Sequence, residues 1–445
     1  MHPAAPADFL ERARYVQSQL PPGGLFADQE WRISPSPFPL AASFVRELES
    51  LGRILLQFYR AVNLLHRQSH ATRQPRWIAE LLDQGKPEAL LQWQSEDAFK
   101  RELPRVIRPD ILLTEEGFAI TELDSVPGGI GLTAWLNKTY SEGGDRVIGG
   151  TDGMLQGFEG IFGDAATVNL VISSESASYR PEMEWLAGQL TPGKFQVRDE
   201  HFQGFQPGNA VYRFFELFDL ANIPAAEAIF EGARSGDLTV TPPPRPIFEE
   251  KLLLALLWNR NLREFWRQQL GDGFLKRLLA CIPYTWVIDP APLPPHAAYP
   301  ELNLTDWQQL KGLSQRERDL ILKVSGYSEK AWGARGVYLG SDLSQADWST
   351  AVDEAINAFP RSPYILQRYH KPRTVDAAWV DIEKAELMPM KGRVRLCPYY
   401  FVHGEGDAAR TQLGGVLATI CPADKKIIHG MRDAILAPCS IAAES

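Results

Sequence analysis

Two short strands with charged side chains at alternate positions form the most informative stretch of this sequence. They are predicted at residues 106–114 and 118–124, and residues 115–117 (Glu-Glu-Gly) between them are typical of a β-hairpin turn. The preceding hundred residues are predicted to be helical, because apolar positions between residues 44 and 65 recur every three or four residues. The chain therefore changes from helical to strand-containing structure at about residue 105.

The hairpin is expected to bring four charged side chains together. Side chains two residues apart on a strand share a face, so Arg108 lies beside Asp110. Glu122 lies beside Asp124 for the same reason. A three-residue loop would place Asp110 opposite Glu122. It would also place Arg108 opposite Asp124, whereas a two-residue turn would break this parity.

This arrangement has two interpretations. Carboxylates that face each other repel unless a proton or a cation lies between them. An oxygen-only cluster suits Mg²⁺, whose coordination substrate phosphates usually complete. Arg108 could then contact a phosphate oxygen through two hydrogen bonds. The alternative is a solvated hairpin face with ordinary cross-strand ion pairs.

A lysine followed by a glycine-rich loop occurs about two hundred residues later. Lys323 is near the end of a predicted apolar strand. The loop after it contains three glycines and two further cations, which are Gly326, Lys330, Gly333, Arg335 and Gly336. Glycines let backbone amides approach phosphates, and cations neutralise them. The loop lacks the G-K-[ST] ending of a Walker A motif, and a plain surface loop is the alternative.

Three further positions are candidates for nucleotide or phosphoryl binding. Gln367 ends an apolar strand and could offer its side-chain amide to an adenine edge. Lys251 stands at a predicted helix start, where a cation opposes the helix dipole. Lys391, Arg393 and Arg395 alternate and would share one strand face. That face could accept transferred phosphoryl charge, or it could simply be exposed.

The remaining sequence favours an α/β organisation. Strand and helix patterns alternate between residues 166 and 230, which indicates some parallel strand pairing. Arg213 and Glu216 in this region could contact a substrate carboxylate and amine, or could form a structural ion pair. Proline clusters at residues 242–246 and 290–295 bracket a stretch, 248–279, that is predicted to be helical.

Composition restricts the class of protein. The chain has 445 residues, which suits two or three domains, and a net charge of −9 with no basic run. That charge argues against nucleic acid or an anionic membrane as the main partner. Asp8 and Glu11 stand where a signal peptide would be apolar. The four cysteines form no CxxC pair, so neither a disulfide framework nor a zinc site is expected. We expect a cytoplasmic protein.

The order of these motifs resembles one family. An R-x-D pair, an acidic pair after a short turn, two lysines, a glycine-rich loop and a strand ending in Leu-Gln resemble the circularly permuted ATP-grasp enzymes. Glutathionylspermidine synthase and eukaryotic-type glutathione synthetase are members. The resemblance extends from about residue 105 to about residue 439. It implies an α/β (α+β) ATP-grasp-like fold, circularly permuted, with a helical N-terminal region and an inserted α/β substrate subdomain.

The resemblance also implies a set of site residues. Asp110, Glu122 and Asp124 match metal positions, although Asp124 stands where the family has Asn. The site predicted on this basis has Arg108 and Arg395 as catalytic residues, and Lys251, Lys323, Gly333, Arg335, Gly336 and Gln367 as nucleotide-binding residues. The predicted domains are a helical region (1–104), the metal-carboxylate hairpin with its Gly turn (105–165), an α/β substrate subdomain (166–240) and a nucleotide-binding region with a lid loop (241–445).

The implied activity is ATP- and Mg²⁺-dependent ligation of a carboxylate to an amine through an acyl phosphate. The substrates would be small molecules or peptides, with neither nucleic acid nor a membrane as partner. Two alternatives stay open. Asp124 in place of Asn would also suit a catalytically inactive nucleotide-binding protein. Residues 129–134 fit G-x-G-x-x-A, as in a dinucleotide-dependent oxidoreductase, although the charged strand before them is atypical.

Overall fold

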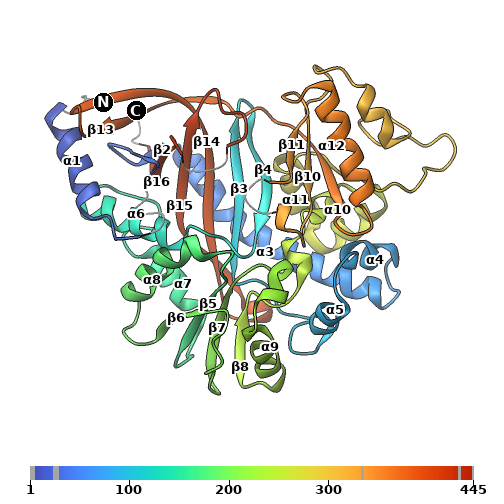
Figure 1. Cartoon of the computed structure of the whole chain (residues 1–445), viewed down its shortest axis with the longest axis horizontal. Coiled ribbons are helices and arrows are strands. Elements are labelled where there is room, and N and C mark those ends of the chain that lie inside the picture. Colours follow the sequence, from blue (N-terminus) through green and yellow to red (C-terminus); the bar gives the residue numbers. More distant parts are fainter. Residues whose placement is uncertain (1–5, 24–29, 332–334, 429–431, 443–445) are drawn as a thin grey trace. The chain divides into compact units, whose positions relative to one another are not determined.

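The computed structural model describes two compact units of the chain (Figure 1). The described residues are 6–23, 30–331, 335–428 and 432–442. Unit 1 comprises Met1–Leu56, Asp97–Pro243 and Pro372–Ser445, and unit 2 comprises Gln57–Glu96 and Pro244–Lys371. The four domain ranges predicted from the sequence are a different division of the chain, and they remain a prediction. Gly333 lies outside the described residues.

The main sheet of unit 1 contains, in the described part of the chain, eight strands in a mostly antiparallel arrangement. Its path is β1-β16-β15-β14-β3-β4, with β13 paired to β14 and β2 paired to β16. The strands are β1 (Arg32–Ile33), β2 (Phe38–Leu40), β3 (Val106–Thr114), β4 (Gly117–Asp124), β13 (Thr374–Asp381), β14 (Glu386–His403), β15 (Arg410–Pro422) and β16 (Ile435–Ile441).

Strands β14 and β15 are the two longest strands and lie at the centre of this sheet. Figure 1 shows them as long neighbouring arrows, with β3 and β4 beyond β14. Helices α6 (Ile130–Glu142) and α7 (Gly153–Gly160) pack on the sheet. Buried aromatic side chains such as Phe158 and Phe401 join these layers in one core. α1 (Pro6–Ser18) adds Ala13 to the same core.

A second, parallel sheet in unit 1 confirms the strand–helix alternation predicted from the sequence. Its order is β6-β5-β7-β8, with every neighbouring pair parallel. The elements are β5 (Val168–Ile172), α8 (Arg180–Gln189), β6 (Phe195–Asp199), β7 (Asn209–Phe214), α9 (Ala225–Ser235) and β8 (Leu238–Thr241). Every residue of β5 and β7 is buried, as expected for central parallel strands.

Unit 2 is built on a four-stranded sheet, within the described residues, of order β11-β10-β12-β9. The strands are β9 (Thr285–Val287), β10 (Leu320–Val324), β11 (Val337–Leu339) and β12 (Tyr364–Arg368), and neighbours are antiparallel. Helix α12 (Gln345–Ala358) buries Trp348 against one face. Its N-cap is Ser344, whose hydroxyl accepts a hydrogen bond from the Asp347 amide.

The helices confirm the prediction for the first hundred residues in part. Besides α1, they are α3 (Ala42–His70), whose residues fall in both units, α4 (Trp77–Asp83) and α5 (Glu88–Ser95). The helical stretch predicted at 248–279 is divided into α10 (Leu252–Trp258) and α11 (Arg263–Cys281). Short 3-10 turns are η1 (Ala177–Tyr179), η2 (Leu217–Asn222), η3 (Pro246–Glu249), η4 (Arg260–Leu262), η5 (Trp307–Gly312), η6 (Glu329–Ala331) and η7 (Gly406–Ala408).

Strands β1 and β2 were not expected in a helical region. Both pair in parallel with β16, about four hundred residues away in sequence. With two and three residues they are too short to show an alternating pattern, so their distant partner determines them. Within the described residues, no helix combines the length and the apolar character that crossing a bilayer requires.

Candidate functional site

The β3–β4 hairpin has the predicted cross-strand pairs, although its turn differs from the prediction. Thr114 pairs with Gly117, so Glu115 and Glu116 form a two-residue turn, and the expected three-residue loop is wrong. Such a turn would have put the charged side chains out of phase. The register shifts between Asp110 and Ile111, however, and this β-bulge adds one residue on β4.

The bulge restores the parity that the charged positions need. Beyond it Asp110 pairs with Glu122, and Arg108 pairs with Asp124. The Thr121 hydroxyl donates to the Asp110 carbonyl at 3.3 Å, which ties the bulge to the opposite strand. The prediction that these four side chains meet across the hairpin is therefore confirmed, for a reason that the sequence did not show.

Arg108 forms ion pairs with two carboxylates of the hairpin and one hydrogen bond to a backbone carbonyl. Its Nε lies 3.1 Å from Asp110 Oδ1, and its Nη2 lies 3.0 Å from Asp124 Oδ2. Its Nη1 donates to the Gly128 carbonyl at 3.2 Å. Burial alone would lower the pKa of Arg108, but the two carboxylates outweigh it and raise that pKa well above its usual value. Arg108 therefore stays charged and orders both carboxylates.

Asp110 lies among three groups from two strands. Besides Arg108, it faces Arg395 of β14, whose Nη1 lies 3.2 Å from Asp110 Oδ2. The Cys397 thiol donates to Asp110 Oδ1 at 3.5 Å. Burial and then Asp110 raise the pKa of Cys397 to about 12, so the thiol remains protonated. The sequence contains a signal for this contact. Cys397 follows Arg395 by two residues on one strand, so both side chains lie on the same face.

Glu122 and Asp124 supply the more accessible carboxylates of the hairpin. Asp124 is 24% exposed at its side chain, against 8% for Asp110. Burial, and then the negative charge of Glu122, raise the pKa of Asp124 despite the opposing charge of Arg108. Among the described residues, the three hairpin carboxylates do not form a group with all ligand atoms within 4.8 Å of one another. Arg108 lies between Asp110 and Asp124 and accounts for this separation.

The glycine turn after β4 is closed by a protein carboxylate. Glu182 of α8 accepts hydrogen bonds from the amides of Gly129 (2.8 Å) and Leu132 (3.0 Å), at the start of α6. Gly129 has φ of +85°, and a Cβ at Gly131 would lie 2.2 Å from the Glu182 carbonyl oxygen. The G-x-G-x-x-A motif therefore serves helix packing. β4 is also antiparallel to its neighbour, so the dinucleotide interpretation is disfavoured.

The buried Glu182 predicts a pH dependence of stability. Its burial raises its pKa from 4.5 to about 7, although the two amides lower it. Between these values the folded state binds more protons than the unfolded state, so stability falls as pH rises. Glu182→Gln removes this titration, and its melting temperature should improve relative to wild type as pH rises from 5 to about 7. The exposed Glu184→Gln is the matched control, and parallel melting curves for Glu182→Gln and wild type would contradict the assignment.

In unit 2 the structure brings together two of the predicted nucleotide residues. Lys323 on β10 is 6% exposed, and its Nζ donates to Gln367 Oε1 at 2.9 Å. Gln367 on β12 in turn donates to Thr285 Oγ1 of β9 at 3.1 Å. A hydrogen-bonded row therefore crosses three strands of the sheet. It fixes the lysine and the amide on the same face.

Lys251 approaches the end of the same sheet from a different element. Its amide donates to the Ser325 carbonyl at 3.1 Å, just beyond the end of β10. Its Nζ donates to the carbonyls of Ser325 (3.5 Å) and Ala331 (3.4 Å). Because Ala331 belongs to the glycine-rich loop, Lys251 and this loop are neighbours. The two predicted lysines therefore lie on elements that meet at Ser325.

The residue before Lys251 belongs to a fully buried ion pair that the sequence did not reveal. Lys86 Nζ lies 2.6 Å from Glu250 Oε1, and the two side chains are 0% and 1% exposed. The Ser325 hydroxyl donates to the other oxygen of Glu250. This pair therefore fixes the segment that carries Lys251.

The described end of the glycine-rich loop is ordered by the sheet. The Gly336 carbonyl accepts a hydrogen bond from the Val324 amide at 3.0 Å. Arg335 is exposed beside it. Lys330 forms an ion pair with Glu354 of α12, which also accepts from the Tyr338 hydroxyl at 2.8 Å. Lys330 is thus engaged in a surface ion pair.

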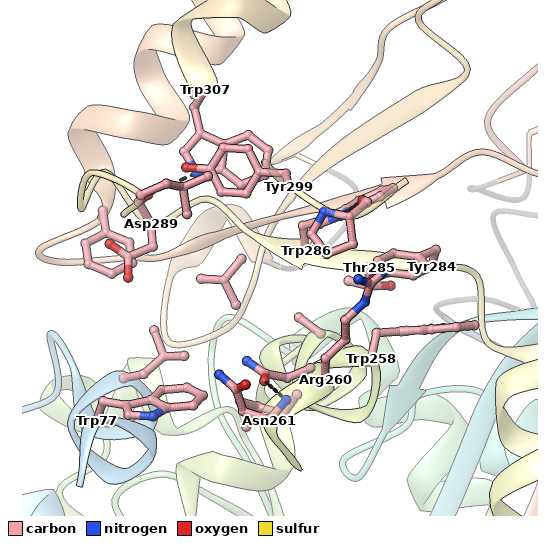
Figure 2. A pocket seen from close by; sticks show the side chains of 18 of the residues that line it. Trp77, Trp258, Arg260, Asn261, Tyr284, Thr285, Trp286, Asp289, Tyr299 and Trp307 are labelled. Atoms are coloured by element: carbon pink, nitrogen blue, oxygen red, sulfur yellow. Dashed lines mark hydrogen bonds between the residues drawn. The ribbon is translucent and has the colours of Figure 1, made fainter. Parts of the chain in front are cut away.

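An aromatic cavity of about 530 Å³ lies in unit 2, and Thr285 of the hydrogen-bonded row is among its lining residues (Figure 2). Tyr284 stacks with Trp258 at 4.5 Å between ring centroids. Tyr299 stacks with Trp307 at 3.7 Å on a second wall. Figure 2 shows Arg260 directed toward Tyr284 and Thr285. The size and aromatic lining suit a small molecule with a flat ring. None of these aromatic residues is among the site residues predicted from the sequence.

Arg213 is not available to bind a substrate, so that interpretation is wrong. It is 1% exposed and donates to the carbonyls of Pro242, Phe215 and Pro243. Lys391, Arg393 and Arg395 do share one face of β14, as predicted. Lys391 pairs with Asp376 at 2.8 Å on the surface, so Arg395 is the member of this row that reaches the hairpin.

Comparison with solved structures identifies the fold. The chain is similar to a glutathione synthetase-like effector from Globodera pallida in its apo form, with a TM-score of 0.55 and 12% identity over 99% of this chain and 98% of that chain. At this identity the likeness shows the fold alone, and it confirms the predicted mixed α/β, ATP-grasp-like fold.

The other comparisons add no argument. A structure from Methylobacillus flagellatus, provisionally named a gamma-glutamylcysteine synthetase, has a TM-score of 0.41 and 13% identity over 85% of this chain and 87% of that chain. This TM-score is too low to support a conclusion. No known protein-family model matches the chain, and no curated protein matches it.

Proposed function

We propose that this chain is an ATP-dependent carboxylate–amine ligase that works through an acyl phosphate. The observation that carries the proposal is the register of the β3–β4 hairpin. It gathers Arg108, Asp110, Glu122 and Asp124 in a chain whose fold is glutathione synthetase-like. The circularly permuted arrangement is part of the same proposal.

The nucleotide lysines give independent support from unit 2. Lys323 is buried and already bonded to Gln367, so little conformational freedom is lost when it meets a phosphate. Lys251 is anchored beside the loop that contains Arg335 and Gly336. We assign these residues to the triphosphate of ATP and Gln367 to its adenine.

The donor set of the hairpin suits magnesium, with unequal shares. Glu122 and Asp124 are the carboxylates we assign as ligands, because they are the more accessible. Each oxygen of Asp110 already faces a protein group, although a carboxylate oxygen has a second lone pair for an ion. Bound Mg²⁺ would neutralise phosphate charge, and oxygen ligands together with phosphates are its usual surroundings.

The proposed reaction has two steps. A substrate carboxylate oxygen attacks the γ-phosphorus, the new P–O bond forms, and ADP leaves with the electron pair of the broken bond. An amine then attacks the acyl carbon, phosphate leaves with its oxygen, and the amine loses a proton. Arg108 keeps Asp110 and Asp124 in place, and Arg395 adds positive charge beside them. Such chemistry depends mainly on positioning and charge stabilisation.

A non-catalytic nucleotide-binding protein is a second candidate, and one observation favours it. Each nitrogen of Arg108 lies within 3.2 Å of a protein oxygen, and Asp110 contacts two arginines. A network that satisfies its own charges is stable without a ligand. This candidate predicts ATP binding without ADP formation.

The deciding experiment measures melting temperature with ATP, once with Mg²⁺ and once with a chelator. Binding to the folded state raises the melting temperature by mass action. A rise that requires Mg²⁺, followed by ADP release with an acid–amine pair in a substrate screen, supports the ligase. A rise without ADP release on any pair favours the non-catalytic protein. No rise at saturating ATP would overturn both.

A further inference from the structure

A histidine pair and one carboxylate converge at the junction of α3 and α4 in unit 2. His66 and His70 are one turn apart at the end of α3, and Asp83 ends α4. The His66 and His70 Nε2 atoms are 3.3 Å apart. Asp83 Oδ1 lies 2.9 Å from His66, and its Oδ2 lies 2.7 Å from His70. Three potential ligand residues from two helices therefore meet at one point.

The geometry and chemistry of this cluster suit a transition metal. Zinc binds imidazole nitrogen and carboxylate oxygen, and ligand atoms on a tetrahedral ion with bonds of about 2.0–2.1 Å lie about 3.3 Å apart. The two histidine nitrogens already have this separation. Within the described residues, His66, His70 and Asp83 form the group whose ligand atoms all lie within 4.8 Å of one another.

Burial closes one side of the cluster and leaves the other open. The side chain of His66 is 3% exposed, whereas that of His70 is 54% exposed. Burial lowers the pKa of His66, which favours the neutral imidazole that a metal requires. An ion can therefore enter from the His70 side and keep water as a further ligand.

Two neighbours surround the ligands, with opposite effects. Gln94 donates to Asp83 Oδ1 at 2.7 Å, and among the described residues its own buried Oε1 has no hydrogen-bond partner. Such an outer amide orients the carboxylate. Arg245 Nη2 lies 3.3 Å from His66 Nδ1. Metal binding moves the His66 proton to Nδ1, so Arg245 must release this contact while its Nη1 keeps the Gln94 carbonyl.

We propose that His66, His70 and Asp83 bind one zinc ion that links the end of α3 to the end of α4. Arg245 limits the affinity, because its charge and its contact with His66 oppose the ion. Trp77 of α4 lines the aromatic cavity (Figure 2). Gln84, the residue after Asp83, lines it as well. The ion therefore fixes one wall of that cavity.

The test uses the full chain after metal is removed with a chelator. Zinc is then added back, and the zinc that is retained after dialysis is measured by elemental analysis. In a separate sample of the metal-free chain, Co²⁺ is added as a spectroscopic probe of tetrahedral N/O coordination. Wild type should retain one zinc per chain, show the visible Co²⁺ absorption, and melt at a higher temperature with zinc. His70→Ala, at an exposed position, should weaken zinc binding by roughly 100-fold, because even outer partners are worth about 10–100-fold.

A matched variant separates this site from adventitious binding. His201 is 71% exposed and also lies near a carboxylate, Glu200, at 3.9 Å. His201→Ala should bind zinc as wild type does. Equal zinc responses in wild type and His70→Ala, or no Co²⁺ absorption in wild type, would overturn the proposal and leave a metal-free hydrogen-bonded cluster. None of these readouts depends on ATP.

Discussion

Replacement of Glu122 by Gln is expected to abolish ADP formation while leaving the fold intact. The change keeps the shape of the side chain but removes the charge that we assign to magnesium. A metal ion stabilises transferring phosphoryl charge by several kcal/mol, and each 1.36 kcal/mol is tenfold in rate, so turnover should fall by roughly 1,000-fold or more. ADP release on the best acid–amine pair of the substrate screen measures the effect.

A second result is expected for Glu122→Gln, and it distinguishes a loss of turnover from a loss of folding. Glu122 raises the pKa of Asp124 by like-charge repulsion, so its neutralisation should leave the melting temperature unchanged or slightly higher. Glu116→Gln, in the exposed turn of the same hairpin, is the control and should retain full turnover. Near-wild-type ADP release by Glu122→Gln would remove the metal assignment.

Replacement of Lys86 by Met is expected to cost the largest amount of stability among the variants considered. It leaves Glu250 charged and buried without its cation, and such a loss typically costs about 3–5 kcal/mol. Urea unfolding followed by tryptophan fluorescence measures it, because Trp266 and Trp348 are buried in unit 2. The double variant Lys86→Met with Glu250→Gln should recover part of the loss, since no unpaired charge remains.

An exposed ion pair in the same unit supplies the comparison. Lys330 pairs with Glu354 at the surface, where its side chain is 48% exposed. Lys330→Met should change the free energy of unfolding by at most about 1 kcal/mol. If Lys86→Met costs no more than Lys330→Met, burial of the Lys86–Glu250 pair contributes nothing special.

Local patterns predicted the strands of the site well. Alternating charge identified β3 and β4, and the apolar runs that lead to Lys323 and Gln367 identified β10 and β12. These strands are long or buried enough for their own side chains to determine them.

Features that depend on distant partners were not predictable. The bulge opposite Asp110 changes the hairpin by one residue, and nothing in the local pattern distinguishes it from a longer turn. Glu182 caps α6 from fifty or more residues away in sequence. Lys86 meets Glu250 across a separation of more than 160 residues. A single sequence does not reveal such pairs, because charge and spacing alone allow many partners.

Contact between distant segments also governs how this chain can be divided. Its path crosses between the two units at residues 56–57, 96–97, 243–244 and 371–372, so neither unit is one continuous segment. A fragment of residues 244–371 would carry Glu250 without Lys86 and would lack α4 and α5. Neither unit can therefore be exchanged between related chains as one continuous stretch of sequence without separating residues that contact each other. Recombination must instead transfer both segments of unit 2 together. The same requirement applies to recombination during evolution.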